Sequence, residues 1–217
     1  MPNYCENELQ VRGPKEDVQR FMKKARLGEE AISISSFYPI PESLEKSEAG
    51  GQEAYYRILH EGIVDDYLKE HMRKDGFENP TKEKALEWQA KCWKKTVKEA
   101  TEIANQYKHN METYGHTTWY TWCIQNWGTK WDVKESSLVS SEEILIRNKK
   151  VWEINYAFLS AWSPPREAFF TISKDYPTLQ FVLKFWESGM EFKGVFECKD
   201  GKVFSNKQEQ YSGSRGG

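Results

Sequence analysis

Polar and hydrophobic positions alternate along the first part of the chain, over residues 4–11. One side carries Cys5, Asn7, Leu9 and Val11, and the other carries Tyr4, Glu6, Glu8 and Gln10. This period of two predicts a half-buried β-strand. Gly13-Pro14 ends the strand, and Pro14 suits the first position of a helix because its missing N–H needs no partner there. Apolar residues then recur at helical spacing as far as Ala25, so the pattern predicts a strand–turn–helix unit.

A second unit of the same kind begins at Trp152. Alternation over residues 152–159 predicts a strand that runs into Ser163-Pro164-Pro165, where Ser163 is predicted to be the N-cap of a short helix. Three more strands are predicted, over residues 179–187, 191–199 and 202–205. Two strand–helix units, each followed by strands, predict an α+β protein with a ferredoxin-like βαββαβ sheet-and-helix layer.

The segment between these units has almost no strand pattern and predicts helices. Asn79-Pro80 is the candidate start of a long helix, along which apolar residues are spaced alternately four and three apart. These residues are Leu86, Ala90, Trp93, Val97, Ala100, Ala104, Tyr107, Met111 and Tyr114. A seam of about four heptads needs a facing helix. The segment around Tyr56, Leu59, Ile63 and Tyr67, turned at residues 74–76, is the local candidate for that helix.

These patterns predict a discontinuous ferredoxin-like domain over residues 1–48 and 115–211, with a long helical insertion over residues 49–114. The Ser- and Gly-rich residues 212–217 are predicted to form a flexible tail. A homodimer that pairs two helical seams is the alternative to an insertion that packs on itself. We therefore expect a monomer, or a homodimer through the helical insertion.

Composition narrows the class of protein. Of the 217 residues, 14% are aromatic and nine are Trp, which supplies the buried area that disordered chains lack. We expect Trp152 in the sheet core, Trp93 in the helical seam and Trp88 on a basic helix face. The formal net charge of -2 gives no chain-wide positive field for nucleic acid.

The distribution of apolar and cysteine residues bears on compartment and cofactors. No apolar run reaches the roughly 18–20 residues of a membrane span, and the start has no basic-then-apolar signal, so we expect a cytoplasmic protein without membrane contact. The four cysteines, Cys5, Cys92, Cys123 and Cys198, stand singly and lack metal-ligand spacing. We therefore expect no metal and no cofactor.

Three stretches of the sequence resemble a known family. They are Met1–Asn7, Trp122–Trp131, and the pair Trp162–Pro165 with Glu187–Gly194. They are similar to the YubB family, phage- and plasmid-encoded, Api-like proteins with a ferredoxin-like domain and no established biochemical activity. The resemblance covers residues 1–45 and 115–199, and the string Asn-Trp-Gly-Thr-Lys-Trp at 126–131 is its most specific part. It implies the fold and a mobile-element origin, and it carries over no catalytic residue.

The Trp-dense block at residues 119–131 has two interpretations. In one, its rings attach a helix to the sheet while their N–H groups find backbone carbonyls. In the other, the turn at 126–131 meets the turns at 162–164 and 187–190 and forms a small-molecule pocket, with Lys130, Ser163 and Glu187 as polar contacts. The residues of this candidate pocket are Asn126, Trp127, Gly128, Lys130, Trp131, Trp162, Ser163, Glu187 and Met190.

Nucleic-acid binding has one local candidate, a stripe on the predicted long helix. Its residues are Lys84, Trp88, Lys91, Lys95 and Lys98. Lysines interleaved with an aromatic ring suit a phosphate backbone. Neighbouring glutamates at ion-pair spacing make a solvated helix face the plainer interpretation. The predicted open face of the sheet is polar and net acidic, with Tyr4 and Trp186 as its rings, which disfavours base stacking there.

No catalytic arrangement stands out in the sequence. The four histidines, His60, His71, His109 and His116, lie in or beside the insertion without a completing carboxylate. Nucleophile and phosphate-loop motifs are missing as well. The sequence therefore predicts a non-enzymatic binding module that acts on a protein partner, through the helical insertion or the Trp-rich turns. Nucleic-acid association through the lysine stripe and a small-molecule pocket at residues 126–131 are the alternatives.

Overall fold

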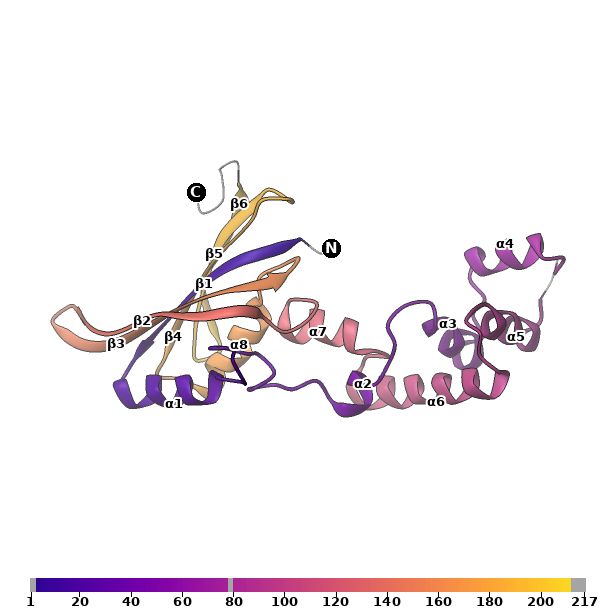
Figure 1. Ribbon diagram of the computed structural model, residues 1–217, viewed down its shortest axis with the longest axis horizontal. Helices are drawn as coiled ribbons and strands as arrows, with labels where there is room; N and C mark the ends of the chain where they lie inside the picture. The colour runs from indigo at the N-terminus through magenta and orange to yellow at the C-terminus, as the bar shows by residue number, and fades with distance from the viewer. Residues whose placement is uncertain (1–2, 78–79, 212–217) are drawn as a thin grey trace. The chain divides into compact units, whose positions relative to one another are not determined.

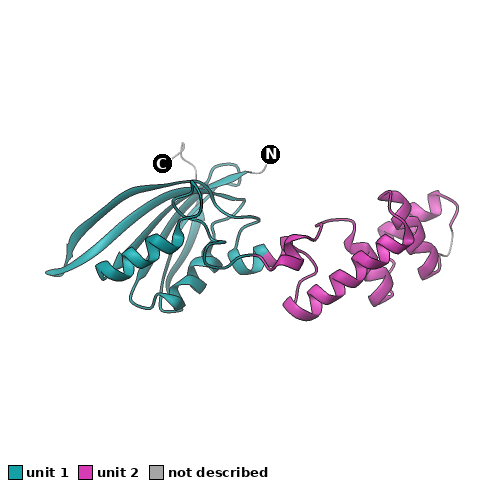
Figure 2. Cartoon of the chain, turned by 60° about the horizontal axis from the view of Figure 1, so that its bottom comes forward, with its two compact units in different colours: residues 1–39, 123–217 teal, residues 40–122 magenta. Residues whose placement is uncertain are grey.

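The computed structural model describes residues 3–77 and 80–211. The chain forms two compact units, residues 1–39 with 123–217, and residues 40–122 (Figure 2). The first unit contains the sheet and the second is helical. The second unit therefore extends beyond the predicted insertion of 49–114 at both of its ends.

The first unit is built on one six-stranded antiparallel sheet. Its strands are β1 Tyr4–Gly13, β2 Lys134–Ile146, β3 Lys149–Ala161, β4 Gln180–Glu187, β5 Phe192–Lys199 and β6 Lys202–Gln210. They lie in the order β2-β3-β1-β4-β5-β6. With helices α1 (Lys15–Ala25) and α8 (Arg166–Asp175), the first four strands form the predicted βαββαβ layer, and β5 and β6 extend it.

The alternation of polar and apolar residues in the sequence does not predict strand β2. Its pairing with β3 shifts register between Lys134 and Ser137 and again between Leu138 and Ser140. Each shift places the following residues on the opposite face, so no single period of two runs along the strand. Strands β1, β3 and β4 keep the predicted alternation, and each has a neighbour on both sides that holds it in register.

Helices α1 and α8 cover the same face of the sheet (Figure 1). The strand residues that face them are buried, with Leu9 on β1, Tyr156 on β3 and Phe181 on β4 at 0–2% exposure. Phe21 of α1 packs edge-on against Phe181, with ring centroids 5.5 Å apart. Burial of each such side chain stabilises the fold by about 1.5–3 kcal/mol.

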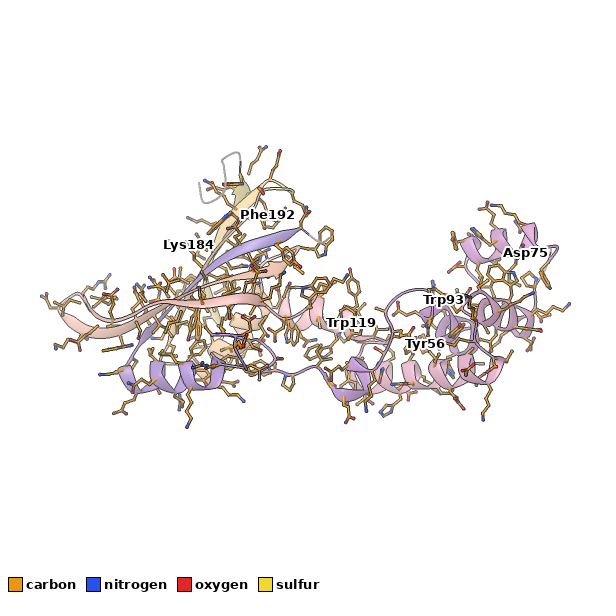
Figure 3. All side chains as sticks on the ribbon, viewed as in Figure 1. Tyr56, Asp75, Trp93, Trp119, Lys184 and Phe192 are labelled. Carbon is orange, nitrogen blue, oxygen red and sulfur yellow. The ribbon has the colours of Figure 1, made fainter. Side chains whose placement is uncertain are left out.

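The opposite face of the sheet is polar, as its alternation predicts. Glu8 stands opposite Lys184, and Gln10 stands between Asn155 and Val182. Trp186 lies on this face, half-buried, opposite Glu6. Figure 3 labels Lys184 on β4 and Phe192 at the start of β5.

Two helix starts in the first unit differ from the expectation. Pro14 is the N-cap of α1 rather than its first residue, and Pro165 rather than Ser163 is the N-cap of α8. Ser163 therefore lies outside α8. Two consecutive prolines keep the chain extended before Arg166, because the residue before a proline is disfavoured in helical backbone.

The second unit contains short helices packed on one long one. These are α2 Glu42–Glu45, α3 Glu53–Tyr56, the π-helix η1 Arg57–Glu61, α4 Asp66–Lys74, α5 Lys82–Cys92 and α6 Val97–Tyr114. Helix α7, Trp119–Trp127, crosses the boundary between the units. The predicted single long helix is wrong, because the chain breaks between α5 and α6.

The break has a local cause. Thr96 caps α6, accepting from the backbone N–H of Glu99 while the Glu99 carboxylate accepts from the N–H of Thr96. Such a capping box fixes a helix start. Lys94 adopts a left-handed backbone at φ 53°, which no α-helix continues through. At the start of α5, Thr81 is the N-cap; the expected cap, Asn79, lies outside the described residues.

The segment predicted to face the long helix packs against α6, but the residues that it buries there are not the predicted ones. Tyr55 and Ile58 are buried in one core with Ala100 and Ala104 of α6, whereas Ile63 and Tyr67 are 48% and 71% exposed. Tyr55 lies in α3, before η1 begins, so the buried face starts one position earlier in the sequence than predicted. Helices within the unit therefore cover much of the apolar seam.

Three tryptophans differ from their expected environments. Trp93 is 45% exposed and follows α5, where its indole lies so close to Gly51 that a Cβ there would be 2.4 Å from Cζ2 (Figure 3). Trp88 packs half-buried against the helical core, and its Nε1 donates to Asp75 at 2.8 Å. Trp152 is half-buried beneath Lys15, 4.3 Å from its Nζ.

The second unit is larger than the predicted insertion because both flanks bond to α6. The Asn110 amide donates to the carbonyls of Ser43 at 3.3 Å and Thr117 at 3.0 Å. The Tyr107 hydroxyl donates to the carbonyl of Glu48 at 2.6 Å. These buried polar bonds join residues on both sides of the insertion, which no local pattern reveals.

Thiol reactivity tests the packing of both units. Cys92 is exposed, whereas Cys5, Cys123 and Cys198 are buried. Burial raises the pKa of Cys5 and Cys123 to about 12 and that of Cys198 to about 11. Because the thiolate is the reactive form, we expect one fast-reacting thiol per chain with Ellman's reagent at pH 8.

The other three thiols should react only after unfolding in denaturant. Replacing Cys92 by Ser should remove the fast phase and leave the slow ones unchanged. Two or more fast thiols in the native protein would contradict the packing described.

Candidate functional site

Two of the three predicted turns are hydrogen-bonded to each other. The Ser163 hydroxyl donates to the carbonyl of Gly128 at 2.5 Å. Thr129 Oγ1 donates to the carbonyl of Ala161 at 2.9 Å and accepts from the Ala161 N–H at 3.1 Å. The turn after α7 is therefore fastened to the end of β3.

Asn3 connects the third turn to this pair. The backbone N–H of Trp162 donates to the carbonyl of Asn3 at 3.0 Å. The Asn3 side chain lies against Gly189, where a Cβ would be 2.6 Å from Nδ2. Asn3 therefore links the three turns, and we call the surface of Gly128–Trp131, Trp162–Ser163 and Ser188–Met190 the rim.

Glu187 does not present a free carboxylate at the rim. Its side chain is 3% exposed, and it accepts from the backbone N–H of Gly189 at 2.8 Å and from that of Met190. These bonds satisfy the buried charge and hold the turn between β4 and β5. The structure assigns Glu187 to this turn instead of the predicted ligand contact.

A buried polar chain lies under the rim. Asn7 Nδ2 donates to Ser160 Oγ at 2.8 Å and to the Cys5 carbonyl at 2.8 Å. Ser160 in turn donates to the Ser163 carbonyl at 2.8 Å. Asn7 is not among the predicted pocket residues, although it is the one polar residue on the apolar side of the first strand.

The remaining residues of the candidate pocket differ in how far they are exposed to solvent. Trp127 is 2% exposed and its Nε1 donates to the carbonyl of Tyr38 at 3.1 Å, so it belongs to the core. Lys130 lies 4.7 Å above the ring of Trp131, which is half-buried. Asn126 is exposed near the end of α7. The Trp-dense block therefore combines both interpretations, with buried packing at Trp127 and accessible groups beside it.

Trp162 and Gly128 have left-handed backbones, with φ of 70° and 78°. Glycine adopts this conformation freely, but for a bulky residue it is a costly outlier. Trp162 is nevertheless 43% exposed, so burial of its ring does not explain its presence there. Met190, on the adjacent turn, is 58% exposed. These are the accessible apolar groups that the rim holds in fixed positions.

The structure divides the predicted lysine stripe. Lys84, Trp88 and Lys91 lie on α5 and line a cleft of about 770 Å³ together with Asp75 and Glu87. Lys95 falls in the break after α5, and Lys98 lies on α6, 4.0 Å from Glu102. Within the cleft the two lysines are balanced by two carboxylates. The five stripe residues therefore do not form one continuous cationic face.

Over residues 3–77 and 80–211, no group of three His, Cys, Asp or Glu side chains is placed to hold a metal ion. Burial lowers the pKa of His116, which favours its neutral form. Within the same part of the chain, every helix is too short or too polar to cross a bilayer.

The polar chain under the rim can be tested by mutation. Replacing Asn7 by Ala leaves the Cys5 carbonyl without this donor and the Ser160 hydroxyl without this partner. We expect a loss of about 1–3 kcal/mol of unfolding free energy, measured by urea titration. The matched control is Asn155→Ala on the open face, where one amide donates to Ser140 at 2.9 Å in a more accessible place. Equal losses for both variants would show that the buried chain has no special role.

Comparison with known proteins agrees with the predicted fold. Residues 141–215, about a third of the chain, match the family model described as the ferredoxin-like domain in Api92-like protein. A crystal structure of the protein api92 from Yersinia pseudotuberculosis is similar at 13% sequence identity, with 99% of each chain covered and a TM-score of 0.44. Among curated proteins none matches the chain. The predicted ferredoxin-like α+β fold is confirmed, and the C-terminal part of the chain is similar to the domain found in Api92-like protein.

Proposed function

We propose that the protein is a non-enzymatic binding module that docks a protein partner at the rim. The observation that carries this proposal is Trp162, a 43% exposed indole on a left-handed backbone that is fixed by hydrogen bonds on both sides. The backbone N–H of Trp162 donates to the carbonyl of Asn3, and the hydroxyl of the adjacent Ser163 donates to the carbonyl of Gly128. An exposed side chain on a strained backbone that hydrogen bonds hold in place is more typical of a functional surface than of packing.

The chemistry of the rim suits a protein partner. Tryptophan is the residue most enriched among binding hot spots, and methionine is also enriched at interfaces. Because the rim is already held by hydrogen bonds, binding would cost little ordering entropy. The described polar groups beneath it are satisfied within the chain, which leaves the apolar groups as the natural contacts.

The proposal includes the setting in which the module works. A phage, prophage or plasmid origin rests on the resemblance of the rim segments to the YubB family. A homodimer through the helical unit is a separate proposal, supported by the exposure of Trp93 and Val97, each 45%.

The rim proposal predicts that removing one ring abolishes partner binding without unfolding the protein. Trp162→Gly removes the indole and relieves the backbone strain, so the melting temperature should not fall. Retention of a partner from host lysate by the tagged full-length chain should fall by about tenfold or more, the loss typical of a hot-spot residue. Trp162→Phe keeps a ring and should retain part of the binding.

The control is Phe204→Ala, because Phe204 is 63% exposed on β6, away from the rim segments. Nuclease treatment of the lysate should not change the amount of partner that the tagged chain retains. Release of the partner by nuclease would favour nucleic-acid association instead. If the Trp162→Gly variant retains as much partner as the wild type, docking at the rim is refuted.

A further inference from the structure

A cleft beside α1 has the size and lining of a small-ligand site. It has a volume of about 510 Å³, within the range of sites that hold small molecules. Its lining comes from α1, from the segment after α1 and from the end of α8: Arg20, Lys23, Lys24, Phe37, Asp175 and Tyr176. All six residues belong to the first unit and none belongs to the rim.

The charges of this cleft favour an anion. Three cationic side chains face one carboxylate, and that carboxylate is engaged, since Asp175 accepts a hydrogen bond from the Tyr38 hydroxyl. Burial, with Asp175 next in effect, raises the pKa of Tyr38, so this hydroxyl keeps its proton. Lys23 and Lys24 are exposed, and within the described chain neither has a carboxylate within ion-pair distance. Their positive charge is therefore available to a ligand.

The aromatic side of the cleft is rigid. Tyr176 is 7% exposed, with its ring 6.0 Å from that of Phe37 and nearly perpendicular to it. Phe37 stacks on Phe21 with centroids 5.2 Å apart. Arg20, which also lines the cleft, lies 5.1 Å above Tyr176 and pairs with Asp17 at 3.1 Å. Flat apolar groups pack well against such rings.

A second hollow lies beside α1, and there Glu29 offsets the charge of Arg26. It also measures about 510 Å³, shares Lys23, and adds Arg26 beside Glu29 and Tyr156. Cations in the last turn of a helix partly serve the helix dipole. That role does not account for aromatic rings placed beside the lysines.

We infer that the cleft between α1 and the end of α8 binds a nucleoside phosphate, with the phosphates at Lys23, Lys24 and Arg20 and the base against the half-buried ring of Phe37. Charge alone would suit any phosphate, and the rings alone would suit any flat molecule. The combination selects a ligand that carries both. This site is independent of partner docking at the rim.

Calorimetric titration of the full-length chain tests the assignment with matched probes. ADP, GDP, CDP and UDP carry ring and phosphates, pyrophosphate carries the charge without the ring, and adenosine carries the ring without the charge. At least one nucleoside diphosphate should bind about tenfold or more tightly than either pyrophosphate or adenosine. The ring and the phosphates should each raise the affinity by about a factor of ten or more. Its affinity should fall as salt is added.

Variants then locate the site. Lys23→Gln with Lys24→Gln should weaken nucleotide binding by about tenfold or more, whereas Lys202→Gln, an exposed lysine on β6, should leave it unchanged. Phe37→Leu should bring the nucleotide affinity down to that of pyrophosphate, with folding checked by thermal melting. The assignment is overturned if no nucleotide binds at millimolar concentration, if pyrophosphate binds equally well, or if the double lysine variant binds like wild type.

Discussion

The pairing of β1 with both β3 and β4 is the constraint on which the first unit depends. Leu9 stands opposite Tyr156 on one side and Leu183 on the other, so a strand from the start of the chain lies between two from its last third. A slip of one residue would place Asn7 and Leu9 on the polar face and the glutamates in the core. The register is therefore fixed by burial, and the helical unit is inserted into a fold whose halves must meet.

The same register builds the rim. Because β1 lies beside β3 and β4, Asn3 at its start reaches both Trp162, after β3, and Gly189, after β4. Asn7, four residues further along the chain in β1, donates a hydrogen bond to the Ser160 hydroxyl. The left-handed backbone of Trp162 is held by these bonds to a strand about 160 residues away in sequence. The strained backbone at the rim is thus bonded to the residue that precedes the central strand β1.

Charge is distributed locally, and the net charge of -2 conceals it. On the open sheet face, acids and lysines stand opposite each other across strands, as Glu8 does with Lys184. On α5 the two lysines of the predicted stripe share their cleft with Asp75 and Glu87. Beside α1 the balance differs, because Asp175 and Asp17 already have partners and Lys23 and Lys24 do not. Local pairing rather than total charge decides which surface attracts an anion.

The sequence by itself determined the elements whose signal is local. Period-two alternation located β1 and β3 to β5, and Pro14 and the helical spacing after it located α1, because each pattern reports burial of a single element. The tertiary structure alone decided what depends on neighbours. Packing against α6 buried Tyr55 and Ile58 rather than the predicted positions, and the capping box at Thr96 divided the long helix. Glu187 became a buried acceptor for its own turn instead of a ligand contact. Phe37 and Tyr176 joined the α1 lysines for the same reason: a cleft consists of side chains from separate segments, and only packing brings them together.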